Sequence, residues 1–175
     1  MNGLQDISSE IYSWGFCVKS EKLKRGGNMY LISACLCGVN CKYNGGNNFN
    51  EKVYRLYKEN KALLVCPEEL GGLPTPRTPC EIVEGSAIEV LNGKGKILNK
   101  DGLDVTENFI KGAKEVLKVA KAENCKLAIL KSKSPSCGKG QIYDGSFSGK
   151  LTNGNGITAE ILIENGVEVF TENDI

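Results

Sequence analysis

Three cysteines of the sequence each follow a short hydrophobic run of strand length. Cys35 follows MYLISA, Cys66 follows ALLV, and Cys137 lies in SPSCG just after KLAIL. If these runs are neighbouring parallel strands, their ends share one edge of a sheet, where open α/β folds bind ligands. The chain has no histidine, the commonest general base and nitrogen ligand for metals. We therefore expect chemistry based on thiolates, carboxylates, hydroxyls and lysines.

The first of these cysteines belongs to a C-x-C-x3-C array formed by Cys35, Cys37 and Cys41. The array lacks the C-x2-C pairs typical of structural zinc sites. Cys35 and Cys41 could still share a metal if a turn at Gly38 folds the loop back. The alternative is that Cys35 is a small buried residue at a strand end, because free cysteine is among the most buried residue types.

The other two cysteines lie beside groups that could take part in proton transfer. Glu68 follows Cys66 by two residues in C-P-E, and the proline-rich loop after it has the length and irregularity of a functional segment. Ser134 precedes Cys137 in KSKSPSCGKG, whose lysines we expect to lower the pKa of the Cys137 thiol. Phosphate binding by this Gly- and Ser-rich loop is a weaker hypothesis, because the G-x4-G-K-[ST] and G-x-G-x-x-G spacings are missing.

Composition narrows the class of protein and its partners. A chain of 175 residues favours one domain. With 22 basic and 21 acidic residues, the net charge of +1 argues against bulk nucleic acid as a partner. The sequence shows neither the apolar run of a signal peptide nor a membrane-length segment, so we expect a cytoplasmic protein that does not enter a membrane. In that compartment, eight cysteines favour metal or redox chemistry over disulfides.

The sequence divides at Met29, where the first clear strand pattern begins. We interpret residues 1–28, which include Cys17, as an appended N-terminal extension without a chemical role. Residues 29–175 are predicted to form a single domain.

Strand and helix patterns alternate along that domain, which predicts the α/β class: a mainly parallel, Rossmann-like sheet of about four strands with helices on both faces. The expected helices include one over residues 50–61 and one from a capping box at Asp104 and Glu107 to about residue 123. A small β-hairpin insertion is expected over residues 86–98, with Asn92-Gly93 at its turn. The predicted parallel strands span residues 30–34, 62–65, 127–130 and 167–170.

Three motifs together carry a family resemblance. They are S-A-C-L-x-G-x-x-C-x-Y-x-G, then C-P-E with GGLPTPR, and then K-S-K-S-P-S-C-G with IYDGSFSG. In this order and at these separations they resemble the DUF523 family, from about Met29 to Phe170. That family includes thiouracil desulfurases, which use a 4Fe-4S cluster held by three cysteines.

The resemblance implies a role for specific residues of this chain. Carried over motif by motif, it makes Cys35, Cys66 and Cys137 the cofactor and metal ligands. It likewise makes Glu68 and Ser134 the catalytic side chains.

The chain departs from the family pattern at three positions: Cys37 stands for the usual Leu, Lys42 for Arg and Asn44 for Asp. Cys41 or Cys37 therefore stays open as a substitute ligand. The remaining cysteines, Cys80 and Cys125, are interpreted as packing residues.

The implied chemistry agrees with general principles. Three thiolates leave one iron of the cluster with an open position, and a soft thiocarbonyl sulfur would bind there. Glu68 would then deprotonate the attacking water, and Ser134 would donate a hydrogen bond or a proton. We thus expect a non-redox desulfidase that acts on a small thiolated nucleobase such as 2-thiouracil and releases hydrosulfide. In an aerobic preparation the cluster is expected to be lost or replaced by zinc.

Two other classes fit parts of the sequence. One is a zinc-stabilised small-molecule-binding module, with Cys35, Cys41, Cys66 and Cys137 as a structural tetrathiolate. The other is a thiol redox enzyme with a nucleophilic Cys137 and Cys35 or Cys41 as its resolving partner. The absence of any C-x2-C pair counts against the redox enzyme.

Overall fold

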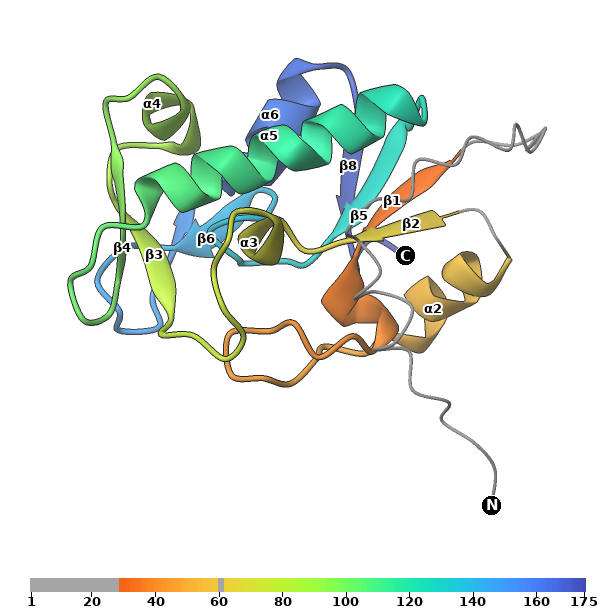
Figure 1. Cartoon of the computed structure of the whole chain (residues 1–175), viewed down its shortest axis with the longest axis horizontal. Helices are drawn as coiled ribbons and strands as arrows, with labels where there is room; N and C mark the ends of the chain where they lie inside the picture. The colour runs from red at the N-terminus through yellow and green to blue at the C-terminus, as the bar shows by residue number, and fades with distance from the viewer. Residues whose placement is uncertain (1–28, 60–61) are drawn as a thin grey trace.

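A computed structural model of the chain describes residues 29–59 and 62–175 (Figure 1). The predictions for residues 1–28, including Cys17, lie outside the described residues. Within the described ranges, no helix combines the length and the apolar character that crossing a membrane would require.

A parallel sheet with strand order β2-β1-β5-β8 forms one end of the molecule. In the centre of the sheet, Ile32 of β1 is in register with a residue of β2 on one side and of β5 on the other. The prediction of four parallel strands is therefore confirmed, with bounds that differ by at most one residue. The strands are β1 (Tyr30–Ser33), β2 (Ala62–Val65), β5 (Leu127–Leu130) and β8 (Glu168–Thr171).

Helices cover both faces of this sheet, as predicted. Successive residues of β1 point to opposite faces. Leu31 packs into the core shared with α5 (Thr106–Ala122) and α6 (Ile157–Glu164), whereas Ile32 packs on the side of α2 (Glu51–Lys58). Because all four strands are parallel, their carboxyl ends meet at one edge.

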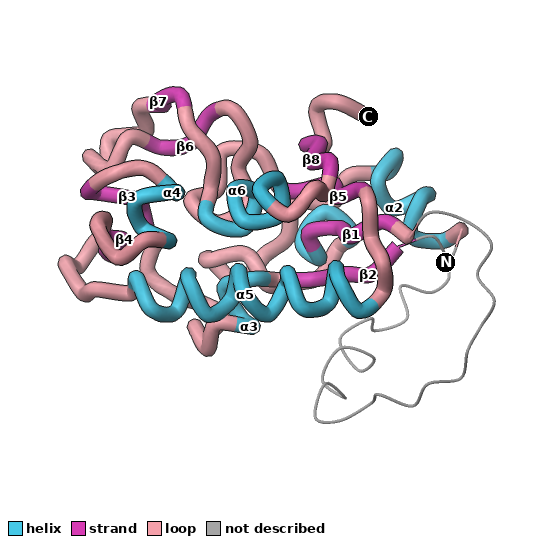
Figure 2. Tube along the Cα trace, turned by 90° about the horizontal axis from the view of Figure 1, so that it is seen from above, coloured by secondary structure: helices cyan, strands magenta, loops and turns pink. Residues whose placement is uncertain are grey.

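Two antiparallel hairpins and a short helix form the other end of the molecule, and α5 spans both ends (Figures 1 and 2). A separate hydrophobic core fills this region, with contributions from Ile82, Val90 and Phe109. The hairpins pair β3 (Cys80–Glu84) with β4 (Lys96–Asn99), and β6 (Gln141–Tyr143) with β7 (Leu151–Asn153); α4 spans Ala87–Leu91.

A small antiparallel insertion is present, as predicted, but its predicted range of 86–98 is wrong, because the first half of that range is the helix α4. Ser86 and Glu89 form a capping box: the Ser86 backbone N–H donates to the Glu89 carboxylate at 2.7 Å, and Glu89 N–H donates to Ser86 Oγ at 3.4 Å. Asn92 and Gly93 follow this helix instead of turning a hairpin. The true partner of β4 is β3, earlier in the chain.

The capping box predicted for α5 is also not formed. The N-cap residue is Val105, which has no side-chain cap, and α5 begins at Thr106. Asp104 Oδ1 instead accepts a hydrogen bond from the Thr106 N–H at 2.9 Å.

A close backbone contact fixes the short helix α3 (Pro67–Leu70) against α5. A Cβ atom at Gly112 would lie 1.9 Å from the Pro67 carbonyl oxygen, and one at Gly71 would lie 2.1 Å from the Asn108 carbonyl oxygen. Asn108 Nδ2 also donates to the Gly71 carbonyl at 3.0 Å. Only glycine allows this approach, which sets the position of the turn that follows β2.

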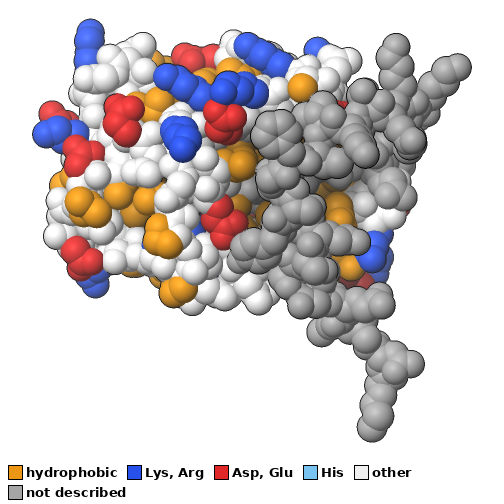
Figure 3. All heavy atoms as spheres, in the orientation of Figure 1, with side chains coloured by type: hydrophobic (Ala, Val, Ile, Leu, Met, Phe, Trp, Pro, Cys, Tyr) orange, Lys and Arg blue, Asp and Glu red, His pale blue; other side chains and the backbone are white. Residues whose placement is uncertain are grey.

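Charged side chains of both signs are interspersed over the described part of the face drawn in Figure 3. This distribution matches the near balance of 22 basic and 21 acidic residues in the sequence.

Candidate active site

The carboxyl ends of the parallel strands open into a cavity of about 420 Å³. This volume lies in the range of about 300–1,000 Å³ that is typical of small-molecule sites. All five residues singled out from the sequence line it, together with Cys41, whereas Cys37 does not. The predicted residues of the cavity are Cys35, Cys66, Glu68, Ser134 and Cys137.

The first wall comes from the loop after β1. The chain continues from β1 into a 3-10 helix, Ala34–Cys37, which ends at Gly38 with a left-handed φ of 92°. The loop then turns back, and Asn48 N–H donates to the Cys35 carbonyl at 2.9 Å. The turn expected at Gly38 is present, and it brings Cys41 beside Cys35.

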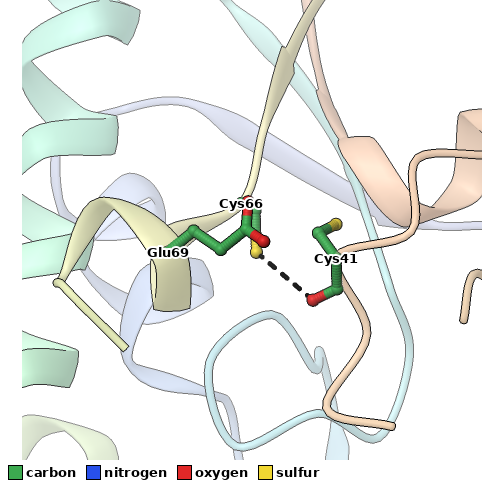
Figure 4. Close-up of side chains that lie close together, drawn as sticks. All are labelled: Cys41, Cys66 and Glu69. Carbon is green, nitrogen blue, oxygen red and sulfur yellow. Dashed lines mark hydrogen bonds between the residues drawn. The ribbon is translucent and has the colours of Figure 1, made fainter. Parts of the chain in front are cut away.

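The thiols of Cys35, Cys41 and Cys66 form a connected group that joins the loop after β1 to the turn after β2. The Cys41 side chain hydrogen-bonds to the thiols of both Cys35 and Cys66. Cys66 Sγ in turn donates to the Cys41 carbonyl oxygen at 3.9 Å (Figure 4). The sulfurs of Cys41 and Cys66 and a carboxylate oxygen of Glu69 lie within 4.8 Å of one another, so these three side chains could hold a soft metal ion.

The hydrogen bonds within this group shift the pKa values of the Cys35 and Cys41 thiols in opposite directions. The bond from Cys41 lowers the pKa of Cys35 and outweighs its burial. The pKa of Cys41 is raised, first because its thiol is bonded to Cys35 and Cys66 and then by burial. Cys35 is thus the more acidic thiol of the pair.

Cys137 approaches the same cavity from the end of β5. Ser33 Oγ donates to Cys137 Sγ at 3.4 Å and accepts from the Lys131 backbone N–H at 3.0 Å. The expectation that neighbouring lysines lower the pKa of Cys137 is wrong: the residue is only 5% exposed, and burial raises the pKa. The Lys131 ammonium group pairs instead with Glu172.

Ser134 presents a hydroxyl group beside this thiol. Its Oγ accepts the backbone N–H groups of Ser136 and Cys137, each at 3.1 Å. Among the described residues, no acceptor is bonded to its hydroxyl hydrogen. Ser134 can therefore donate to a molecule in the cavity.

Glu68 lies in the first turn of α3 and is paired with Arg77 of the proline-rich loop. Arg77 Nε donates to Glu68 Oε2 at 2.6 Å, and its Nη2 forms an ion pair with the same oxygen. Burial alone would lower the pKa of Arg77, but the Glu68 carboxylate reverses this and raises it. Arg77 was not among the site residues predicted from the sequence, although it is the only basic residue of that loop.

The hairpin end of the molecule supplies further residues that line the cavity. Cys80 packs against the second core but also lines the cavity, so its interpretation as a packing residue alone was incomplete. Glu81, also missed, accepts the backbone N–H groups of Gly145 and Phe147 at 2.9 and 3.0 Å through Oε2. It thereby fixes the IYDGSFSG loop.

Two cysteines lie in hydrophobic cores and do not line the cavity. Cys37 packs on the α2 side of the sheet, and Cys125, as expected, packs at the end of α5. Burial raises the pKa of Cys37 to about 12 and that of Cys125 to about 11.

Comparison with known proteins decides the family. The family model described as 2-thiouracil desulfurase matches residues 30–174. The chain belongs to this family. It is 48% identical over 147 residues to the uncharacterized protein YbbK of Bacillus subtilis (strain 168). The aligned region covers 84% of this chain and 97% of that protein. A solved structure of the 4Fe-4S-dependent thiouracil desulfidase TudS has a TM-score of 0.76 and 38% identity, covering 85% of this chain and 93% of that one.

The donor set of the cavity fits an iron-sulfur cluster. Such clusters are held by cysteine thiolates, and here the thiols of Cys35, Cys66 and Cys137 come from the ends of three adjacent strands. The lowered pKa of Cys35 makes the ionised form that a metal binds more accessible. Cys41 adds a fourth thiol within hydrogen-bonding distance of two of these residues.

Proposed function

We propose that this protein is an iron-sulfur-dependent desulfidase that hydrolyses the C–S bond of a small thiolated nucleobase, such as 2-thiouracil, without net redox change. One observation carries the proposal: the cavity joins three thiols that follow parallel strands to a carboxylate and to a serine whose hydroxyl hydrogen has no acceptor among the described residues. Membership of the 2-thiouracil desulfurase family supports the same reaction.

Cys35, Cys66 and Cys137 would hold the cluster in this proposal. When bound, a cluster with three protein ligands supplies a soft Lewis-acidic iron that binds the thiocarbonyl sulfur and makes the C–S carbon electrophilic. The thiols are positioned by the sheet itself, because each follows a strand of the same parallel layer.

Glu68 is the proposed general base. Both contacts from Arg77 go to Oε2, and no donor among the described residues is bonded to Oε1. Oε1 can therefore accept a proton from the water that attacks the C–S carbon.

Ser134 is the proposed hydrogen-bond donor to the substrate. Its oxygen accepts two backbone N–H groups, and no acceptor among the described residues is bonded to its hydroxyl hydrogen, so the hydroxyl group can donate to the substrate. Tyr43 and Tyr143 also line the cavity, and their rings can pack against a planar base.

The atoms balance as a hydrolysis. Thiouracil and water give uracil, hydrosulfide and a proton, so no electron donor or acceptor takes part. Glu68 receives the proton of the water in this scheme, and exchange with solvent returns the carboxylate.

A zinc-binding module is a second candidate, favoured by the close grouping of Cys41, Cys66 and Glu69. The thiol redox alternative has less support, since Cys137 is buried and all seven described cysteines are free.

The proposal is tested by strictly anaerobic purification, reconstitution with iron and sulfide, and incubation with 2-thiouracil. We expect about four irons per chain and release of uracil and sulfide in equal amounts. A chain that holds the cluster but releases neither product contradicts the proposal. One zinc per chain, a colourless protein and no turnover would establish the binding module instead.

A further inference from the structure

We propose that Arg77 is a positioning residue for the desulfidase reaction. It orients the Glu68 carboxylate and joins the two loops that carry Cys41 and Cys66. The inference rests on the proposed function, and it gives a role to the GGLPTPR segment, whose arginine no other part of the mechanism uses.

The Arg77 side chain is almost entirely buried, with 7% of it exposed, against 16% for Glu68. Its guanidinium group contacts three segments of the chain. Nε and Nη2 bind Glu68 Oε2. Nη1 donates to the Pro74 carbonyl at 3.3 Å and to Thr75 Oγ1 at 2.9 Å. Nη2 also donates to the Cys41 carbonyl at 3.1 Å.

The way Arg77 binds Glu68 distinguishes the two carboxylate oxygens. An arginine often binds both oxygens of a carboxylate, but here Arg77 makes both of its contacts to Oε2. Oε1 is left without a protein donor among the described residues, on a side chain that lines the cavity. Arg77 thus fixes the carboxylate without occupying the oxygen that the reaction would use.

The contact with the Cys41 carbonyl extends this role to the thiol wall. The same carbonyl accepts the weak hydrogen bond from Cys66 Sγ. One guanidinium group therefore sets the loop after β1, the turn after β2 and the carboxylate relative to one another. A lysine could keep the charge, but its single nitrogen cannot reproduce a rigid fork that reaches all three.

The test compares Arg77→Lys, Arg77→Gln, Glu68→Gln and the double variant Glu68→Gln/Arg77→Gln in the reconstituted enzyme. A misplaced catalytic group can cost about 100-fold in rate. We expect Arg77→Lys to lower kcat for 2-thiouracil about 10- to 100-fold, with KM within about twofold and iron content unchanged. Since both residues act through one carboxylate, the double variant should be no slower than Glu68→Gln alone.

The matched control is Arg55→Lys, since Arg55 forms an ion pair with Glu51 on the exposed surface, where the two side chains are 72% and 70% exposed. It should retain wild-type kcat. Wild-type kcat in Arg77→Lys, multiplied losses in the double variant, or iron content that falls in parallel with kcat would each overturn the inference. A wild-type enzyme without turnover would refute the proposed function itself, whereas an active wild type with an equally active Arg77→Lys variant would refute only the role of Arg77.

Discussion

The parallel-sheet end and the hairpin end of the molecule contribute to the cavity in different ways. The sheet end brings Cys35, Cys66 and Cys137 from segments that follow three adjacent strands, so strand order decides which segments meet. The hairpin end contributes the lining residues Cys80 and Glu81. In this protein the proposed chemistry belongs to the sheet end, and the hairpin end encloses it.

The two ends also differ in what holds their cavity residues. The sheet residues follow strands packed between cores on both faces. The hairpin wall depends on single side chains that bind loop backbone, above all Glu81 with the N–H groups of Gly145 and Phe147. Substitutions at the sheet end should therefore abolish chemistry, whereas those at the hairpin end should loosen substrate binding.

The largest expected effect comes from replacing a proposed ligand at the sheet end. Cys35→Ser, Cys66→Ser and Cys137→Ser should each lose most of the iron after reconstitution and all measurable thiouracil turnover, because a serine hydroxyl is a poor ligand for cluster iron. The measurements are iron and sulfide per chain and uracil release. Cys125→Ser, a buried cysteine that does not line the cavity, is the control and should keep both. A Cys137→Ser variant with full iron content would remove Cys137 from the ligand set.

The next largest effect is expected at the contact between α3 and α5. Gly112→Ala places a Cβ atom 1.9 Å from the Pro67 carbonyl oxygen, so backbone must move. We expect the free energy of unfolding to fall by about 3 kcal/mol, the upper end of overpacking costs, although alanine by itself favours a helix. Turnover should fall as well, since Glu68 lies on α3. Urea unfolding and a thiouracil assay measure the two effects.

Lys114→Ala, on the exposed side of the same helix, is the control for Gly112→Ala. It should leave both stability and turnover close to wild type. Equal stabilities for Gly112→Ala and Lys114→Ala would show that α3 is not fixed by this contact.

A smaller effect is expected at the hairpin wall. Glu81→Ala removes the acceptor of two loop N–H groups, so we expect the free energy of unfolding to fall by about 1.5 kcal/mol. KM for 2-thiouracil should rise while kcat and iron content stay near wild type, because none of the proposed reacting groups belongs to the hairpins. Glu84→Ala replaces an exposed side chain on the same strand and should change neither the free energy of unfolding nor KM. A loss of iron in Glu81→Ala would show that the hairpin end also helps to hold the cluster.

The same division separates what the sequence predicted from what it did not. The strands β1, β2 and β5 are mainly apolar runs, and β8 has apolar residues beside Glu168. Their alternation with helices predicts parallel order, so the convergence of their ends followed from local patterns. At the hairpin end, two local signals compete. Asn92-Gly93 indicated a turn, but the Ser86–Glu89 capping box makes the preceding residues helical.

The residues that sequence analysis missed depend on contacts between distant segments. Ser33 bonds to Cys137 across 104 positions, and Arg77 reaches the Cys41 carbonyl across 36. No local pattern encodes such contacts. The pKa of Cys137 was wrongly predicted for the same reason, since its burial depends on packing from other parts of the chain.

The smallest expected effect is a pH dependence that again contrasts the two ends. Burial alone would raise the pKa of Glu172 at the sheet end, but the hydrogen bonds from Lys131 and Ser132 lower it. Hydrogen bonds from Ser146 also lower the pKa of Asp144 at the hairpin end, where the carboxylate is fully exposed. A lowered folded-state pKa contributes stability above the unfolded value, about 4.3 for Glu and 3.9 for Asp, and this stability is lost as the pH falls through the folded pKa.

Urea unfolding of the iron-free chain between about pH 3 and pH 7 should therefore show a stability difference between wild type and Glu172→Gln that shrinks on acidification. Asp144→Asn should show a smaller difference, because solvent screens an exposed group. Equal pH profiles for the two variants would contradict the view that burial strengthens the hydrogen bonds of Glu172 relative to those of the exposed Asp144.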